Sequence, residues 1–211
     1  MKNKVLLLLS SVVCAMPAFV GILFWDDLPD VMPTHFNLAG EVDGWMGKPM
    51  AVFGLAALMI LIQWLCVWAT SKDPRRKQVS DKVYGLVYWI CPLVSVFASV
   101  LMYGTVFQMP VDVNVIGNAL IGCIFCVIGN YLPKCRQNYT IGIRVPWTLD
   151  DEENWYHTHR FGGYAFALAG VLAFFNIFLH SSYVLMVMIL VAAISPVVYS
   201  YVYYVNHKTS D

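Results

Sequence analysis

A polar stretch from Asn130 to Gly163 interrupts a strongly apolar chain and holds most of the residues that could do chemistry. Its charges are four cations and four consecutive acids, Lys134, Arg136, Arg144, Arg160, Asp150, Asp151, Glu152 and Glu153. Loops longer than about 15 residues without regular structure are usually functional or disordered. The many Tyr, Trp and Ile side chains here argue against disorder. We therefore interpret this stretch as the working surface of the protein.

The histidines of this stretch raise the question of a metal site. Thr148-x-x-Asp151 resembles a helix start, and a helix that begins there would carry His157 and His159 into the next apolar run. Residues two apart on a helix point about 200° from each other, so these histidines could not share a metal ion. Trp155 and His159 are four apart, which places the imidazole near the indole ring. We also find no nucleophile–base spacing or phosphate loop, and we expect no catalytic residue, metal or cofactor.

The segment from Asn138 to Trp147 alternates like a β-strand through Ile143 before it reaches Pro146. A strand needs hydrogen-bonding partners, so we expect a folded or partly re-entrant loop that packs against the apolar segments. Two simpler interpretations stay open. The arginines could hold anionic lipid headgroups, and the four acids could form a solvated first helical turn.

The composition is that of an integral membrane protein. Of 211 residues, 59% are hydrophobic and 12% are charged, whereas soluble domains have about 45–50% apolar and about 25% charged residues. Five of the six cysteines lie in apolar runs, which predicts free thiols rather than a disulfide framework. The net charge is zero and no nucleic-acid-binding motif is present, so we expect no direct binding of nucleic acid.

Six apolar runs are each close to the roughly 20 residues that one crossing of the bilayer needs: Val5–Trp25, Met50–Ala69, Val83–Phe107, Val115–Leu132, Phe161–Leu179 and Tyr183–Val205. The first run has the basic start of a signal peptide but a poor cleavage site, so we expect it to be retained. The sequence predicts an all-α polytopic integral membrane protein with six transmembrane helices, forming a single membrane domain over residues 1–211.

The distribution of Lys and Arg predicts the orientation. Six spans leave only Lys48 of the 13 Lys and Arg residues on one side, and the positive-inside rule makes the other side cytoplasmic. Both termini would then be cytoplasmic (N-in/C-in), as would the long loop 133–160. The loop 26–48 would be a structured extracellular loop that carries five acids, with turn formers that include the hairpin-type dipeptide Asp43-Gly44.

The predicted spans contain no Asp, Glu, Lys or Arg. Gln63, Asn118 and Asn176 are the main polar residues at depth, and we expect them to form hydrogen bonds between helices. The lack of charged groups inside the spans argues against a proton-coupled transporter.

Three motifs resemble the signatures of known families. Leu28-Pro-x-x-x-Pro-Thr-His-Phe-Asn-x-x-Gly-x-x-Asp-Gly-Trp45 resembles the signature of membrane proteins with a DUF1648 region. The motif Gly129-Asn-Tyr-Leu-Pro-Lys-x-Arg-x-Asn-Tyr-x-Ile-Gly-Ile-Arg-x-Pro-Trp-Thr-Leu149 resembles the SdpI family, as does Trp155-x-x-Thr-His-Arg-x-x-Gly163. The resemblance implies a DUF1648-like helical hairpin over residues 5–69, followed by an SdpI-signature region over 115–180.

This resemblance implies a non-enzymatic immunity protein of the bacterial cell membrane that protects its host from a secreted peptide toxin. Some members are thought also to hold a cytoplasmic transcriptional repressor at the membrane. The external sensing loop would comprise Pro33, His35, Asn37, Gly40, Asp43 and Gly44. The cytoplasmic functional face would comprise Asn130, Pro133, Arg136, Asn138, Gly142, Arg144, Pro146, Trp147, Thr148, Trp155, His159 and Arg160. The alternatives are a transporter or exporter of a small amphipathic molecule or peptide, and a membrane enzyme that modifies the toxin or a lipid.

Overall fold

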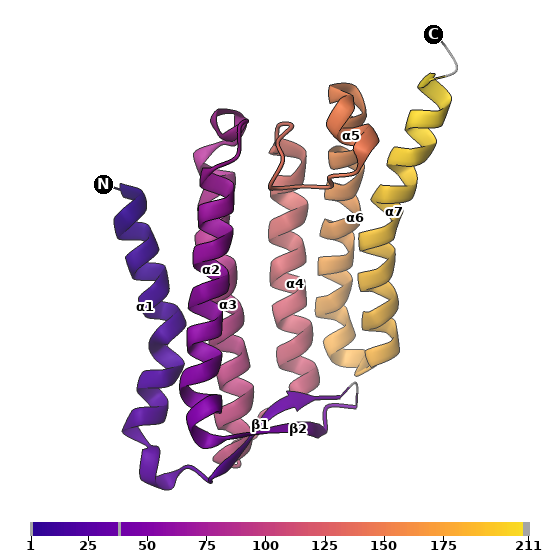
Figure 1. Cartoon of the computed structure of the whole chain (residues 1–211). Helices are drawn as coiled ribbons and strands as arrows, with labels where there is room; N and C mark the ends of the chain where they lie inside the picture. Colours follow the sequence, from indigo (N-terminus) through magenta and orange to yellow (C-terminus); the bar gives the residue numbers. More distant parts are fainter. Residues whose placement is uncertain (1, 38, 209–211) are drawn as a thin grey trace. The chain divides into compact units, whose positions relative to one another are not determined.

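The computed structural model describes residues 2–37 and 39–208, and most of them are helical (Figure 1). Six of the described helices are long and apolar enough to cross a membrane, which confirms the six predicted spans. They are α1 (Lys2–Leu23), α2 (Leu55–Ser71), α3 (Asp81–Val106), α4 (Val113–Tyr131), α6 (Glu152–Leu179) and α7 (Ser182–Lys208).

Shorter elements connect these helices. They are the single helical turns η1 (Trp25–Asp27), η3 (Arg76–Gln78) and η4 (Leu132–Lys134), the π-helical turn η2 (Met50–Gly54) that leads into α2, the short helix α5 (Pro146–Asp150), and the strands β1 (Val31–Phe36) and β2 (Val42–Gly47). In addition to the predicted helices, the chain therefore forms a small antiparallel sheet in the 26–48 loop.

The chain divides into two compact units. The first comprises Met1–Trp68 and Gly85–Gly117, and the second comprises Ala69–Tyr84 and Asn118–Asp211. The first unit therefore contains the β-hairpin, and the second contains the 133–160 loop with the helices that follow it.

A buried glutamine joins three helices of the first unit. Gln63 on α2 accepts hydrogen bonds from Ser11 Oγ at 3.4 Å and Cys14 Sγ at 3.5 Å on α1. Its Nε2 donates to the carbonyl oxygen of Tyr88 on α3 at 3.0 Å, and also to Ser10 Oγ. The side chain is fully buried, and these bonds satisfy its amide in an apolar setting. The predicted interhelical role of Gln63 is confirmed.

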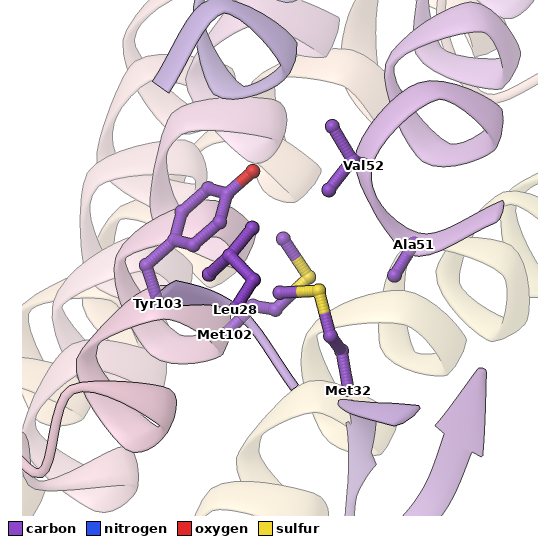
Figure 2. Close-up of a cluster of buried hydrophobic side chains, with 6 residues drawn as sticks. All are labelled: Leu28, Met32, Ala51, Val52, Met102 and Tyr103. Atoms are coloured by element: carbon purple, nitrogen blue, oxygen red, sulfur yellow. The ribbon is translucent and has the colours of Figure 1, made fainter. Parts of the chain in front are cut away.

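An apolar cluster anchors the β-hairpin in the first unit. Met32 of β1 is fully buried against Leu28, Ala51, Val52 and Met102. Figure 2 shows the side chains of Met32 and Met102 pointing toward one another within this cluster. Tyr103 completes the cluster; its hydroxyl donates to the carbonyl oxygen of Pro17 at 2.7 Å.

The turn of the hairpin lies earlier than the sequence suggested. The chain reverses between Asn37 and Glu41. Asn37 Oδ1 accepts from the Glu41 backbone nitrogen, and the Asn37 backbone nitrogen donates to the Glu41 carbonyl oxygen. Gly40 has a positive φ of 82°. Asp43 and Gly44 instead lie within β2, where the pairing with β1 is irregular beside His35. An added Cβ at Gly44 would come within 2.6 Å of His35 Cβ, so this glycine permits close approach of the strands and does not form the turn.

Glycines bring α4 and α6 together in the second unit. An added Cβ at Gly129 would lie 2.5 Å from the Ala167 backbone nitrogen, and one at Gly170 would lie 2.7 Å from that of Cys126. Small residues allow such close backbone approach between membrane helices. Asn176 Nδ2 also donates to Asn118 Oδ1 at 2.9 Å across these helices, so the predicted interhelical role of both asparagines is confirmed.

The helix α6 starts nine residues before the predicted span, at Glu152 rather than Phe161. Asp151 caps it by accepting a hydrogen bond from the Glu153 backbone nitrogen at 2.8 Å, and two acids in the first turn suit the helix dipole. The helix was expected to start near Thr148, but that residue belongs to α5. At the other end His180 takes a left-handed conformation and donates its N–H to the Asn176 carbonyl oxygen. The helix α7 then returns along α6 (Figure 1).

Candidate functional site: the folded loop of residues 133–160

Asn138 organises the centre of the loop. Its side chain is fully buried, and Oδ1 accepts from the backbone nitrogens of Thr140 at 2.9 Å and Ile141 at 2.6 Å. Its Nδ2 donates to the carbonyl oxygens of Arg136 at 2.8 Å and Ile141 at 2.9 Å. Side-chain bonds of this kind replace the partners that a strand would supply. The loop is therefore folded, but the strand-like interpretation of residues 138–143 is wrong.

His159 and Trp155 form the floor of the loop. Their rings stack at 3.9 Å between centroids, as the four-residue spacing predicts, and both side chains are buried. Nε2 of His159 accepts from the Ile143 backbone nitrogen at 3.0 Å, and Nδ1 lies 2.8 Å from the Trp155 carbonyl oxygen. The imidazole is therefore neutral with its proton on Nδ1, because one nitrogen faces a donor and the other an acceptor. Trp155 Nε1 donates to the Cys135 carbonyl oxygen at 2.8 Å.

Gly142 lies directly over this histidine. Its φ is +120°, and an added Cβ would come within 2.3 Å of His159 Nε2 and 3.1 Å of the Trp155 ring. Only glycine fits both the conformation and the space. Gly142 therefore lets the loop backbone approach the His159 ring on α6 closely.

Thr148 and Gln137 attach α5 to the loop. Thr148 Oγ1 donates to the Ile143 carbonyl oxygen at 2.8 Å and accepts from the Val145 backbone nitrogen at 3.1 Å. Gln137 Nε2 donates to the carbonyl oxygens of Thr148 and Leu149, each at 2.9 Å. Both side chains are buried, so this short helix is held at both ends by side-chain hydrogen bonds.

Trp147 joins α5 to α7. Its Nε1 donates to Ser200 Oγ at 2.8 Å, and its ring packs against Tyr201 and Tyr204. Pro146 precedes it in the first turn of α5, where a missing N–H costs nothing. The Asn154 side chain donates to the Ser200 carbonyl oxygen at 3.0 Å, so Ser200 receives two contacts from this region.

The sequence analysis missed an anchor that comes from the loop between α2 and α3. The carboxylate of Asp73, which is 6% exposed, accepts from the Tyr139 backbone nitrogen at 2.9 Å and from Thr140 Oγ1 at 2.7 Å. Arg75 follows with its guanidinium 4.9 Å from the centre of the Tyr139 ring, and it also donates to Gln137. Asp73-Pro74 reads as an ordinary turn, and no spacing in the sequence joins it to residues more than 60 positions away.

The remaining predicted residues of this face surround the buried network. Arg136, Arg144, Arg160, Asn130 and Pro133 are exposed. Arg144 Nη1 donates to the Tyr139 carbonyl oxygen at 2.6 Å, and Arg160 Nη1 donates to the Tyr156 hydroxyl at 3.0 Å. The residues that line a hollow of about 540 Å³ include Lys134, Cys135, Arg136, Gln137, Trp155 and His159. The structure thus joins a buried polar scaffold to an exposed cationic surface.

Burial also raises the pKa of Cys135, the one cysteine of the loop. Desolvation raises the pKa of Cys135 to about 11, with a smaller rise from the nearby negative charge of Asp73, while a hydrogen bond from Asn138 lowers it. The thiol is therefore protonated at neutral pH and belongs to the scaffold. Among residues 2–37 and 39–208 no three His, Cys, Asp or Glu side chains are grouped so that they could hold a metal ion.

The predicted residues of the 26–48 loop occupy the β-hairpin. Nδ1 of His35 lies 2.5 Å from Asp43 Oδ1 across the strands, and both side chains are open to solvent. Asn37 closes the turn by accepting at Oδ1 from the backbone nitrogens of Ala39 and Glu41. Pro33 is buried and pairs with Trp45. His35, Asp43 and Gly44 therefore meet at one place, and Asn37 and Gly40 shape the adjacent turn.

Comparisons with known proteins find family matches that include the 26–48 loop and most of the 133–160 loop. Residues 134–200 match the SdpI/YfhL protein family, and residues 12–60 match a domain of unknown function, DUF1648. The chain is also similar to the immunity protein SdpI of Bacillus subtilis (strain 168), with 23% identity over 204 residues, which cover 93% of this chain and 95% of the relative. No solved structure matches the chain significantly. With the six apolar helices, these findings identify a multi-pass bacterial membrane protein.

Proposed function

Because the chain carries a DUF1648 region followed by an SdpI-family region, we propose that it is a membrane immunity protein that protects its cell from a secreted peptide toxin. The observation that carries this proposal is the similarity to an immunity protein along nearly the full length of both chains. Protection would need no chemical step, since the buried polar groups of the 133–160 loop are engaged in holding its backbone.

The β-hairpin would form the sensing surface outside the cell. The loop 26–48 contains five acids and one cation, Lys48. Lys48 itself is held by the Trp25 carbonyl oxygen at 3.1 Å, with its ammonium 5.1 Å from the centre of the Trp25 ring. The excess negative charge would attract a cationic peptide over about 8 Å at physiological salt. His35 and Asp43 would then contact the toxin directly.

The 133–160 loop would present the cytoplasmic surface. Its buried network fixes the backbone, and the exposed Arg136 and Arg144 lie on that fixed support. A rigid cationic surface could capture an acidic face of a cytoplasmic transcriptional repressor while toxin is bound outside. Signalling of this kind would be a second role beside protection.

Expression in a toxin-sensitive bacterium tests the proposal. Cells that express the chain should survive a secreted cationic peptide toxin that kills the parent strain. Arg144→Ala should lose most of this protection at unchanged membrane abundance, because it removes an exposed charge and one hydrogen bond to Tyr139. Lys77→Ala, which removes an exposed charge from a different loop, should protect fully.

The outcome also separates this proposal from other mechanisms. Toxin recovered from protected cells should have an unchanged mass, and protection should persist when the membrane potential is collapsed. An altered toxin mass would point to an enzyme, and protection that vanishes with the potential would point to an exporter. Full sensitivity of cells with abundant wild-type protein to a panel of such toxins would contradict the immunity role.

A further inference from the structure

A second hollow lies beside the loop, on the surface of the second unit between α4, η4 and α6. It has a volume of about 530 Å³, and its lining changes in character from one end to the other. Lys134, Arg160, Tyr156 and Tyr164 contribute polar groups near the loop, and Ala167 and Val171 are apolar residues farther along α6. We call this feature the α4–α6 groove.

The two cations of the groove have no acidic partner. Among the ion pairs of the described residues, none involves Lys134 or Arg160, and the groove lining contains no Asp or Glu. Lys134 Nζ donates to Asn130 Oδ1 at 2.8 Å, and Arg160 Nη1 donates to the Tyr156 hydroxyl at 3.0 Å. These neutral contacts orient both groups, yet an ammonium and a guanidinium have further donors to offer. The polar end is therefore suited to an anion.

The whole groove, from its charged end to its apolar end, has about the length of one membrane leaflet. Arg160 and Val171 are 11 residues apart on α6, which corresponds to about 16 Å of helix. Half of a hydrocarbon core about 30 Å thick is about 15 Å. A molecule that fills the groove would thus place a charged group at the level of the loop and an apolar chain alongside α6 within the bilayer.

We propose that the α4–α6 groove binds an anionic phospholipid from the leaflet on the side of the 133–160 loop. The phosphate contacts Lys134 and Arg160, the tyrosine hydroxyls donate hydrogen bonds to the remaining headgroup oxygens, and one acyl chain lies along Ala167 and Val171. Basic pockets between membrane helices recognise anionic headgroups in this way. The proposal does not rest on the immunity function, because its residues, charges and dimensions are independent of any toxin.

Native mass spectrometry of the full-length protein in detergent tests this site. Dioleoylphosphatidylglycerol and dioleoylphosphatidylcholine have the same chains, so only the headgroup differs between the two probes. The wild type should retain the anionic lipid more strongly by roughly 10- to 30-fold, as two basic contacts near the surface suggest. The double variant K134Q/R160Q should retain both lipids equally. K72Q/K77Q, which removes two exposed charges from another loop, should behave as the wild type.

Three results on lipid retention would overturn the proposal. They are equal retention of both lipids by the wild type, unchanged retention of phosphatidylglycerol by K134Q/R160Q, and an equal loss in K72Q/K77Q, which would indicate general charge attraction. Displacement of the lipid by millimolar glycerol phosphate would also overturn it, since the site would then be one for a free anion. Thermal unfolding verifies that each variant folds, and the single variants K134Q and R160Q should each lose part of the preference if the double variant does not fold.

Discussion

At the scale of single residues, Gly142 and His159 form one matched pair. Gly142→Ala would place a methyl group against His159 Nε2, 2.3 Å away in the present backbone, and strain a residue at φ +120°. Strain of this kind costs about 1–3 kcal/mol, so we expect a lower thermal midpoint and faster trypsin cleavage after Arg144. Gly85→Ala is the control, since an added Cβ at Gly85 meets nothing within 4 Å. If both variants resist heat and trypsin equally, the glycine has no role in holding the loop.

The thiol of Cys135 gives a second test at this scale. Its pKa is raised from 9.0 to about 11, so at pH 7.5 the thiolate fraction is lower by about a hundredfold than for an ordinary thiol. Maleimide labelling, followed by peptide mass spectrometry, should therefore be slow at pH 7.5 and accelerate as the pH rises toward 11. A cysteine introduced at the exposed Tyr139 provides the fast reference. Equal labelling rates at both positions would show that the loop does not bury Cys135.

At the scale of elements, the sequence predicted what depends on local chemistry. Long apolar runs marked the six spans, and the spacing of Trp155 and His159 placed one ring on the other. The sequence did not predict features that depend on side-chain hydrogen bonds to the backbone, whether the partner is near or distant. The alternation after Asn138 resembled a strand, but its polar groups are satisfied by the Asn138 amide. Asp73 gave no signal, because its partners lie 66 and 67 positions away.

Asp73 connects the α2–α3 loop to the 133–160 loop within the second unit. Asp73→Ala would leave the Tyr139 backbone nitrogen without its acceptor, and would leave Thr140 Oγ1 with only its 3.3 Å bond to Asn138 Oδ1. Unpaired buried polar groups cost about 1–3 kcal/mol, so the loop should become more open to trypsin and protection should fall. Asp81→Ala is the matched control, because Asp81 is fully exposed and its nearest contact with Arg76 is 3.7 Å long. Similar behaviour of the two variants would argue against an anchoring role for Asp73.

The packing of α4 on α6 depends on close backbone approach at Gly129. Gly129→Ala would bring a methyl group to 2.5 Å from the Ala167 backbone nitrogen, which cannot move as a flexible side chain would. Overpacking of this kind costs about 1–3 kcal/mol, and we expect a lower thermal midpoint in detergent. Gly117→Ala on the same helix meets nothing within 4 Å and should leave the midpoint unchanged or slightly higher, since alanine favours helix. Equal midpoints would show that the helices can separate at this point without cost.

At the scale of the whole molecule, the orientation predicted from the sequence links both loops to the proposed function. Six spans leave all but one of the 13 Lys and Arg residues on the side of the termini and the 133–160 loop. Charges near the ends of spans set orientation, and the basic side stays in the cytoplasm. A toxin would then meet the acidic loop 26–48, and a cytoplasmic regulator would meet the cationic loop.

Reporter fusions test this orientation directly. Alkaline phosphatase fused after Glu41 or Met109 should be active, because it folds outside the cytoplasm, and green fluorescent protein fused after Arg144 or at the C-terminus should fluoresce. Replacing Lys72, Arg75, Arg76 and Lys77 by glutamine removes four of the basic charges between the second and third spans, and this should lower the yield of correctly inserted protein. Active phosphatase after Arg144 would reverse the assignment of sensing and signalling surfaces. The α4–α6 groove would then face the outer leaflet, so the same fusion also decides which leaflet supplies its lipid.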